Sequence, residues 1–131
     1  MIYLDTSVAL AQLLAEDRRP PASLWAEPLF ASRLVEYESW TRIHARRLAR
    51  THGDALRALL GRVSFLELSP IVLARALEPF PAPVRTLDAL HLASLAYLRE
   101  QRLDVQLATY DERMAEAARR MAMPLVSLSE A

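Results

Sequence analysis

The sequence predicts an α/β protein in which helices cover both faces of a mostly parallel sheet. Five short apolar or β-prone stretches alternate with longer segments of helical pattern. These stretches are Ile2–Leu4, Leu29–Ala31, Val63–Leu66, Val105–Ala108 and Leu125–Val126. Strands separated by helices pair in parallel, because each crossover returns the chain to the same edge of the sheet. The 131 residues are enough for one domain, 1–131, and no linker or repeat divides them.

The segments between the strands carry helix signals. We expect helices over Ala9–Ala15, Ser23–Glu27, Arg33–Arg50, Asp54–Leu60, Pro70–Leu77, Thr86–Glu100 and Asp111–Met121. Thr51-His52-Gly53 is expected to close the long helix before Asp54 caps the next one. The helix Thr86–Glu100 is almost wholly apolar, which predicts burial on several sides.

Composition limits the function classes. No apolar run approaches the ~20 residues of a membrane helix, and no secretory signal pattern precedes the first strand, so we expect a cytoplasmic protein without membrane contact. The absence of Cys excludes disulfides and thiolate metal sites. Sixteen arginines balance sixteen acids, which argues against nucleic-acid binding by bulk positive charge alone but leaves room for local patches.

Three acids stand near strand ends or helix starts. Asp5 directly follows the first strand, Asp111 follows the strand Val105–Ala108, and Asp88 lies near the start of the most apolar helix. Each has a structural explanation by itself, since Asp caps helices and favours the positive end of their dipole. The carboxyl ends of parallel strands share one edge of the sheet, however, so these acids can meet there.

Glu38 is the fourth acid of this set. A helical wheel places it on an expected inward face with Leu34, Tyr37, Thr41, Ala45 and Leu48. The same wheel turns Glu36 to the opposite side, with Ile43, Arg46 and Arg47. We therefore expect Glu36 to be solvated and Glu38 to need a partner, because an inward carboxylate costs several kcal/mol unless it is paired or metal-bound.

Four carboxylates in one pocket predict a bound cation. They cannot all stay ionised unless a positive charge neutralises them. Oxygen ligands without Cys favour Mg²⁺ or Mn²⁺ over zinc. Such a site suits metal-assisted hydrolysis of phosphodiesters, in which the metal activates water.

The remaining polar candidates have simpler interpretations. We expect His91 to be a satisfied structural histidine, and His44 and His52 to be solvated. Four arginines are expected to form either a charged face toward solvent or a phosphate contact near Glu38: Arg42, Arg46, Arg47 and Arg50. Arg85 stands within reach of an anionic substrate or of the acids. With only two glycines in the chain, nucleotide-cradling loops are absent.

Four blocks of the sequence, in order, resemble the PIN domain in its VapC toxin form. They are Ile2-Tyr3-Leu4-Asp5-Thr6-Ser7, Ser32 followed six residues on by Glu38, Arg85-Thr86-Leu87-Asp88-Ala89-Leu90-His91-Leu92-Ala93, and Ala108-Thr109-Tyr110-Asp111-Glu112-Arg113-Met114. The resemblance spans nearly the whole chain. It implies a PIN-like three-layer α/β/α sandwich around a five-stranded sheet.

The resemblance also implies an activity. It implies a Mg²⁺-dependent endoribonuclease, with Mn²⁺ as a substitute, whose metals are held by catalytic acids matching Asp5, Glu38, Asp88 and Asp111. Our leading hypothesis is that Asp5 and Asp88 bind the catalytic metal, while Glu38 and Asp111 complete the acidic site and help to orient the attacking water. Thr6 and Ser7 would match the hydroxyl positions beside the first acid, and Thr109 stands where some relatives have a further acid. Such toxins are typically homodimers that cut RNA and are held inactive by a cognate antitoxin, whose tail enters the acidic groove.

Three other interpretations come from different classes. The chain can be a PIN-like protein-binding module without catalysis, or a PIN nuclease with an RNA-processing role outside toxin–antitoxin systems. A phosphatase or phosphoacceptor centred on Asp5 is disfavoured. Such proteins usually need a second Asp two residues later, where this chain has Ser7, and receivers use a Lys, which it lacks.

Overall fold

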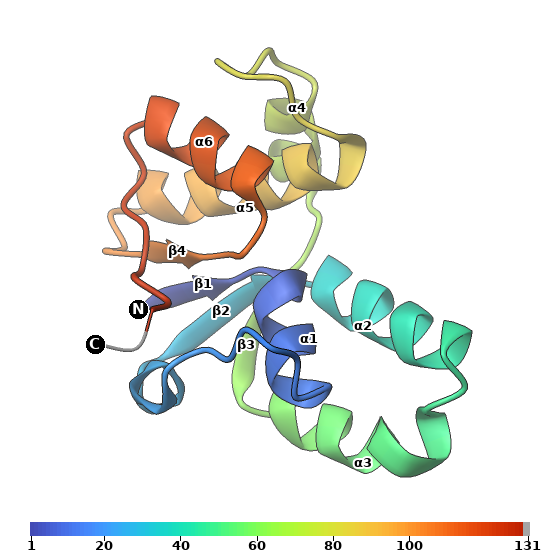
Figure 1. Ribbon diagram of the computed structural model, residues 1–131. Coiled ribbons are helices and arrows are strands. Elements are labelled where there is room, and N and C mark those ends of the chain that lie inside the picture. Colours follow the sequence, from blue (N-terminus) through green and yellow to red (C-terminus); the bar gives the residue numbers. More distant parts are fainter. Residues whose placement is uncertain (130–131) are drawn as a thin grey trace.

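The computed structural model describes residues 1–129 and has the expected alternation of strands and helices (Figure 1). The elements are β1 (Ile2–Leu4), α1 (Thr6–Leu13), the 3₁₀ helix η1 (Ala22–Ala26), β2 (Leu29–Ser32), α2 (Leu34–Ala45), α3 (Ala49–Leu60), β3 (Val63–Leu66), α4 (Pro70–Ala76), α5 (Thr86–Glu100), β4 (Gln106–Ala108) and α6 (Glu112–Arg120). Most bounds lie within three residues of the sequence prediction. The helix α1 begins earlier than predicted, directly after Asp5.

The four strands pair in parallel in the order β3-β2-β1-β4. From β1 the chain steps outward through β2 to β3, and it then crosses back to place β4 on the other side of β1. The direction of winding therefore reverses between β1 and β4. In open α/β sheets the crevice at such a reversal, beyond the carboxyl ends of the strands, is where ligands bind.

Helices cover both faces of this sheet, which confirms the three-layer α/β/α class. The helices α1, α2 and α3 lie on one side, and α4, α5 and α6 on the other (Figure 1). The residues of β1 are apolar on both faces of the sheet, so both faces need a covering layer. Ile2 and Leu4 belong to one buried cluster, and Tyr3 belongs to the cluster on the opposite face. Among residues 1–129, no helix is long and apolar enough to cross a membrane.

The predicted fifth strand is wrong. Leu125 forms a single parallel bridge with Leu107, next to the edge strand β4. Two backbone hydrogen bonds make the contact, from the Leu107 N–H to the Pro124 carbonyl (2.9 Å) and from the Val126 N–H to the Leu107 carbonyl (2.8 Å). The preceding Pro124 has no N–H to extend the ladder. The segment therefore follows β4 only briefly.

The predicted helix Arg33–Arg50 is also wrong, because the chain turns at 46–48. Arg47 takes a left-handed conformation (φ 56°), and the Leu48 N–H bonds to the Ile43 carbonyl at 2.7 Å. This is a common way to end a helix, although Gly more often fills the left-handed position. Gly53 does not end a helix but lies inside α3, beside the ring of Trp40. The result is an antiparallel hairpin of α2 and α3.

Candidate active site

The carboxyl edge of the sheet opens into a hollow of about 570 Å³ at the reversal between β1 and β4. All four predicted acids line it: Asp5, Glu38, Asp88 and Asp111. They come from the end of β1, the second turn of α2, the first turn of α5 and the start of α6. Arg18, Arg42 and Arg85 line the same hollow, so its acids are accompanied by positive charge from three separate segments of the chain.

Asp5 is fixed by hydroxyl groups from two strand ends. Its Oδ2 accepts hydrogen bonds from the Ser7 hydroxyl (2.6 Å) and the Thr109 hydroxyl (2.8 Å), and it caps α1 through the Ser7 N–H. The same hydroxyls accept from the backbone N–H groups of Tyr110 and Asp111, both at 2.9 Å. These bonds tie the end of β1 to the end of β4. Asp5 is only 5% exposed, and these bonds hold its side chain in a single orientation.

Glu38 has the partners that its position demands. Its Oε1 accepts from the Thr6 hydroxyl (2.9 Å) and lies 2.6 Å from the His91 Nε2. Burial alone lowers the pKa of the His91 imidazole, but the hydrogen bond to Glu38 and the charges of Asp5, Glu38 and Asp88 outweigh it and raise that pKa. The ring therefore presents its Nε2 proton to the Oε1 of Glu38.

A buried chain of hydrogen bonds supports this histidine from behind. The Ser32 N–H at the end of β2 donates to the Tyr3 hydroxyl (3.1 Å), and that hydroxyl lies 3.1 Å from the His91 Nδ1. Burial raises the pKa of Tyr3 far above its usual value, so the phenol stays protonated. With Nδ1 occupied by Tyr3, the ring can turn only its Nε2 toward Glu38. His91 is thus satisfied structurally, as predicted, and also contacts the site.

This chain of contacts predicts a stability loss in Tyr3→Phe. The substitution keeps the ring but leaves the buried Ser32 N–H and the His91 Nδ1 without partners, so we expect the free energy of unfolding to fall by about 1–3 kcal/mol. Urea denaturation measures the change. Tyr37→Phe is the matched control, because that side chain is 68% exposed. Equal stability of the two variants would contradict the assigned contacts.

Asp88 is the least compensated of the acids. It is 8% exposed, and its Oδ2 has no hydrogen-bond partner within residues 1–129. Burial raises the pKa of this carboxyl, the negative charges of Asp111 and Asp5 raise it further, and contacts with Arg85 and His91 oppose the shift only in part. A buried carboxylate oxygen without a hydrogen-bond partner is suited to bind a cation in the hollow.

Asp111 lines the hollow and also precedes α6 directly. It caps this helix through the N–H groups of Arg113 and Met114, which is the structural role predicted for an Asp at a helix start. Among residues 1–129, no group of three or more acids, histidines or cysteines is close enough to hold a metal ion. The structure thus brings the four acids to one hollow but does not bring three of them together as ligands. Their catalytic roles stay a prediction.

The wheel that selected Glu38 was wrong about the helix. The buried residues of α2 are Val35, Ser39 and Ile43, whereas Tyr37 is exposed. Glu38 lies beside that buried face, and its side chain is 25% exposed compared with 41% for Glu36. The predicted difference between the two acids holds, but its cause is the contact with Thr6 and His91 rather than a position in the apolar stripe.

Two charged residues that line the hollow were missed by the sequence analysis. Glu16 and Arg18 follow α1, in a segment for which no functional role was predicted. Arg18 reaches the hollow because its guanidinium packs over the ring of Tyr110, 4.7 Å from the ring centre. That contact depends on where α6 begins, and no local pattern in the sequence carries it.

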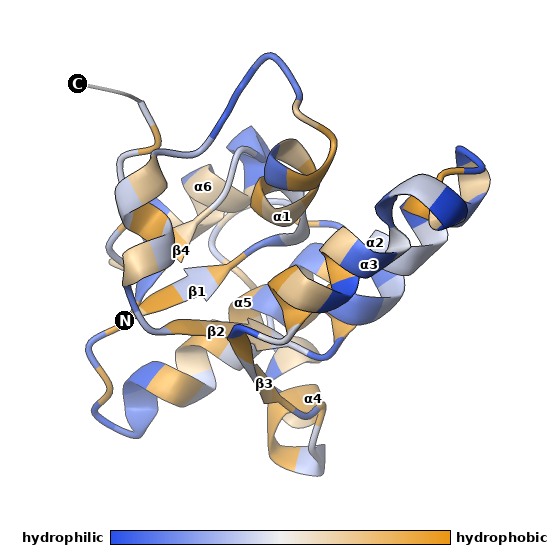
Figure 2. Cartoon of the chain, turned by 90° about the horizontal axis from the view of Figure 1, so that it is seen from below, coloured by the Kyte–Doolittle hydropathy of each residue, from blue (hydrophilic) through white to orange (hydrophobic). Residues whose placement is uncertain are grey.

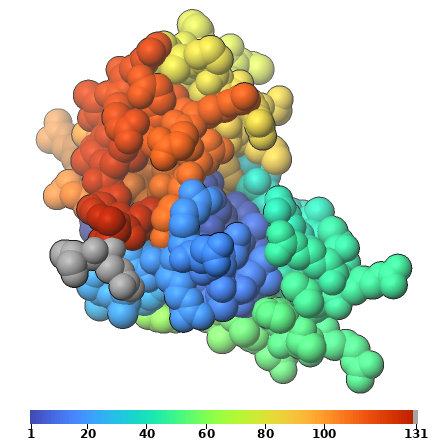
Figure 3. Space-filling model, in the orientation of Figure 1, coloured from blue at the N-terminus to red at the C-terminus, as the bar shows by residue number. Residues whose placement is uncertain are grey.

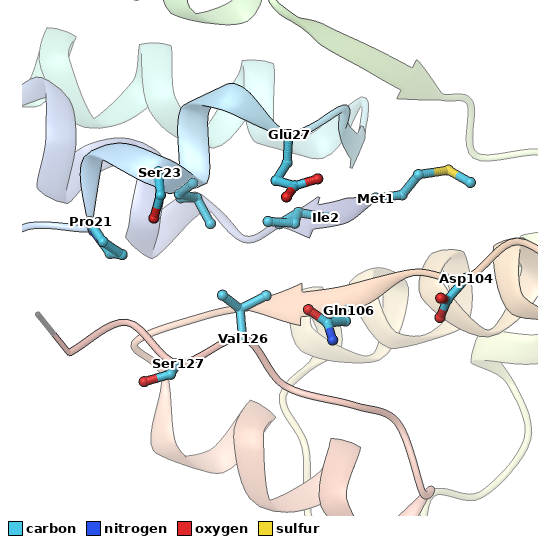
Figure 4. A pocket seen from close by; sticks show the side chains of 10 residues that line it. Met1, Ile2, Pro21, Ser23, Glu27, Asp104, Gln106, Val126 and Ser127 are labelled. Carbon is cyan, nitrogen blue, oxygen red and sulfur yellow. The ribbon is translucent and has the colours of Figure 1, made fainter. Parts of the chain in front are cut away.

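A second hollow lies at the opposite, amino edge of the sheet and holds about 320 Å³ (Figure 4). Its acids are Glu27 and Asp104, and none of the four predicted site residues lines it. It lies away from the winding reversal at the carboxyl edge, so it lacks the features that mark the first hollow.

Comparisons with known proteins place this architecture in a family. A family model described as "PIN domain" matches residues 2–120. The chain is 31% identical over 135 residues to Ribonuclease VapC46 of Mycobacterium tuberculosis (strain ATCC 25618 / H37Rv), covering 98% of each chain. It is 30% identical over 126 residues to Ribonuclease VapC47 of M. tuberculosis (strain CDC 1551 / Oshkosh), covering 91% of this chain and 90% of that one.

A solved structure agrees at the level of the fold. The crystal structure of M. tuberculosis VapC20, described as a sarcin-ricin loop cleaving toxin, superposes with a TM-score of 0.62 at 20% identity, covering 89% of this chain and 95% of that one. The fold, the order of the motif blocks and the family match agree with the resemblance seen in the sequence. The chain belongs to the PIN-domain family and is a VapC-type member of it.

Proposed function

We propose that this protein is a Mg²⁺-dependent endoribonuclease that acts as the toxin of a toxin–antitoxin pair. The observation that carries the proposal is the uncompensated carboxylate of Asp88, buried beside Asp5 and Asp111 in a hollow that also holds Glu38. The relatives named ribonucleases support RNA as the substrate. A structural acid would be paired, whereas a metal ligand is left open for its cation.

In this proposal Asp5 and Asp88 hold the metal, which supplies an activated water and neutralises charge on the phosphate. Ser7 and Thr109 position Asp5 by occupying its Oδ2. Both hydrogen bonds of Glu38 end on Oε1, so its Oε2 is left to orient the attacking water and accept its proton. Asp111 completes the acidic site.

Arginines at the hollow suit an anionic substrate. The guanidinium of Arg85 stands at the start of α5, three residues before Asp88, where it can bind a phosphate oxygen next to the cleaved bond. A cognate antitoxin, a homodimeric state and a cytoplasmic location belong to the same proposal. The VapC names of the relatives support the antitoxin.

Removal of divalent cations tests the proposal directly. Purified protein is expected to cut single-stranded RNA in Mg²⁺ or Mn²⁺, to lose this activity in excess chelator, and to regain it when Mn²⁺ is restored. Denaturing gel electrophoresis of a labelled RNA measures the products. Activity that persists unchanged in chelator would refute the metal-dependent mechanism.

The alternative of a PIN-like binding module without catalysis has one observation in its favour. Among the described residues, no group of three or more acids or histidines is arranged to hold a metal ion. Calorimetric titration with Mn²⁺ separates the two functions, since the nuclease is expected to bind the cation, whereas the module would show no binding heat.

A further inference from the structure

The balanced charge of the chain hides a strong separation of charges. The segment from Ser39 to Arg62 holds six arginines and one acid, Asp54. The rest of the chain holds ten arginines and fifteen acids. This segment, residues 39–62, spans most of α2, the connection and α3, and is called the arm here. One part of a neutral protein is therefore strongly basic.

The arm projects from the body of the molecule. In Figures 1 and 3 the far ends of α2 and α3 extend beyond the layers of the sandwich, and in Figure 2 the tip of this hairpin is mostly hydrophilic. The helix α2 begins at the end of β2, beside the acidic hollow, and runs outward. At a rise of about 1.5 Å per residue, Arg46 at its end lies about 12 Å from Glu38.

Most of the arm's positive charge has no partner in the protein. Arg57 pairs with Asp54, and Arg62 donates to a backbone carbonyl. The other arginines form no ion pair with any of residues 1–129 and are exposed: Arg42, Arg46, Arg47 and Arg50. Like charges gathered on a projection repel one another, so such a cluster favours an anionic ligand.

We propose that Arg42, Arg46, Arg47 and Arg50 bind the phosphate backbone of the RNA strand whose cleaved bond lies in the hollow. This inference rests on the proposed nuclease function. Arg42 lines the hollow, and the other three lie at the tip, so the positive charge is continuous from one to the other. The distance of about 12 Å matches about four nucleotides of a stacked strand at 3.4 Å each.

RNA and an acidic protein are both possible anionic ligands of the arm, but only RNA carries regularly spaced negative charges along its backbone. A guanidinium binds two phosphate oxygens at once, and each contact releases a counterion, so affinity for RNA must fall steeply with salt. An acidic protein partner would leave RNA affinity independent of the arm. The two partners are thus separated by one measurement on RNA.

The experiment measures RNA affinity against salt concentration for the full chain. Asp5→Asn serves as the background so that the RNA is not cut, and a short fluorescein-labelled single-stranded RNA is the probe in fluorescence anisotropy. Adding R47Q and R50Q is expected to weaken binding and to reduce the slope of log K against log [salt] by about 1.4, or about 0.7 for each lost phosphate contact.

R99Q with R102Q is the matched control. These arginines are also exposed and three residues apart, and Arg102 has the same left-handed backbone as Arg47 (φ 64° and 56°). They lie at the end of α5 that is remote from the hollow. The control pair is expected to leave the slope nearly unchanged. An equal fall in both pairs would indicate a general charge effect and overturn the proposal.

The remaining outcomes separate this inference from the proposed function. If the unmodified chain cuts RNA but R47Q/R50Q keeps the original salt slope, only the arm proposal fails, because the arm then makes no contact with the RNA backbone. If the unmodified chain cuts no RNA with any divalent cation, the nuclease function fails regardless of the arm. Circular dichroism of each variant confirms that the hairpin is folded.

Discussion

Asp5→Asn is expected to reduce RNA cleavage by at least about 100-fold while leaving the fold intact. The loss follows because the amide cannot supply the negative charge that a divalent cation needs, and charge stabilisation in the transition state is worth this much or more. The fold survives because the Asn oxygen can still cap α1 and accept from Ser7 and Thr109. The free energy of unfolding should therefore change by less than about 1 kcal/mol.

The measurement pairs cleavage rates with thermal denaturation. Asp104→Asn is the control, because it removes the same charge from an exposed acid at the opposite, amino edge of the sheet and should leave the rate unchanged. Asp5→Asn with near-normal cleavage would remove Asp5 from the proposed mechanism. A large drop in melting temperature would instead assign Asp5 to the structure.

Most of the fold could be predicted from the sequence because hydrophobic periodicity, and the residues that begin or end helices and strands, are local signals. The alternation of apolar strands with helices, and the proline that opens α4, need no tertiary information. The failures occurred where tertiary contacts decide. The segment Leu125–Val126 has strand composition but reaches β4 through one bridge only, and the turn at Arg47 has no glycine to mark it.

The site could be predicted only in part for the same reason. Asp5 and Asp111 were found because both follow strands whose ends must meet. The support behind Glu38 was not found, because it joins Tyr3 to His91 across 88 positions and uses the backbone N–H of Ser32. A backbone donor has no sequence signature. The residues that line the hollow could therefore be predicted better than the hydrogen bonds that fix them.

Asp88→Asn is expected to have the opposite effects on activity and stability. Cleavage should fall at least about 100-fold, because the proposed metal loses a ligand. Without divalent cations, the variant should be more stable than the unmodified chain at neutral pH, because the amide avoids the cost of burying an ionised carboxylate near two other acids. An ionised Asp88 gains about 0.3–1 kcal/mol from the dipole of α5, but burial and the charges of Asp111 and Asp5 oppose it, and the raised pKa shows that they prevail.

The pH dependence has a definite sign. Because the folded state raises the pKa of Asp88, the folded protein binds this proton more tightly than the unfolded chain does. The ionised group therefore costs stability above its folded pKa, and the cost disappears as pH falls through that value toward the ordinary 3.8 of an aspartate. The advantage of Asp88→Asn should shrink over the same range. A constant difference would mean that the charge is not its cause.

Divalent cations should reverse the order of the two proteins. A cation that binds only the folded state stabilises it by RT ln(1 + [L]/Kd), and only the unmodified chain keeps both Asp5 and Asp88 for it. Thermal denaturation in rising Mn²⁺ should lift the unmodified protein past the variant, whose melting temperature stays nearly constant. The reversed order of the two melting temperatures is the informative result. A buried acid without a function would explain why the unmodified protein is less stable in chelator, but it would not explain why Mn²⁺ makes it the more stable of the two. The reversal therefore links the cost of holding Asp88 unpaired to the binding of metal.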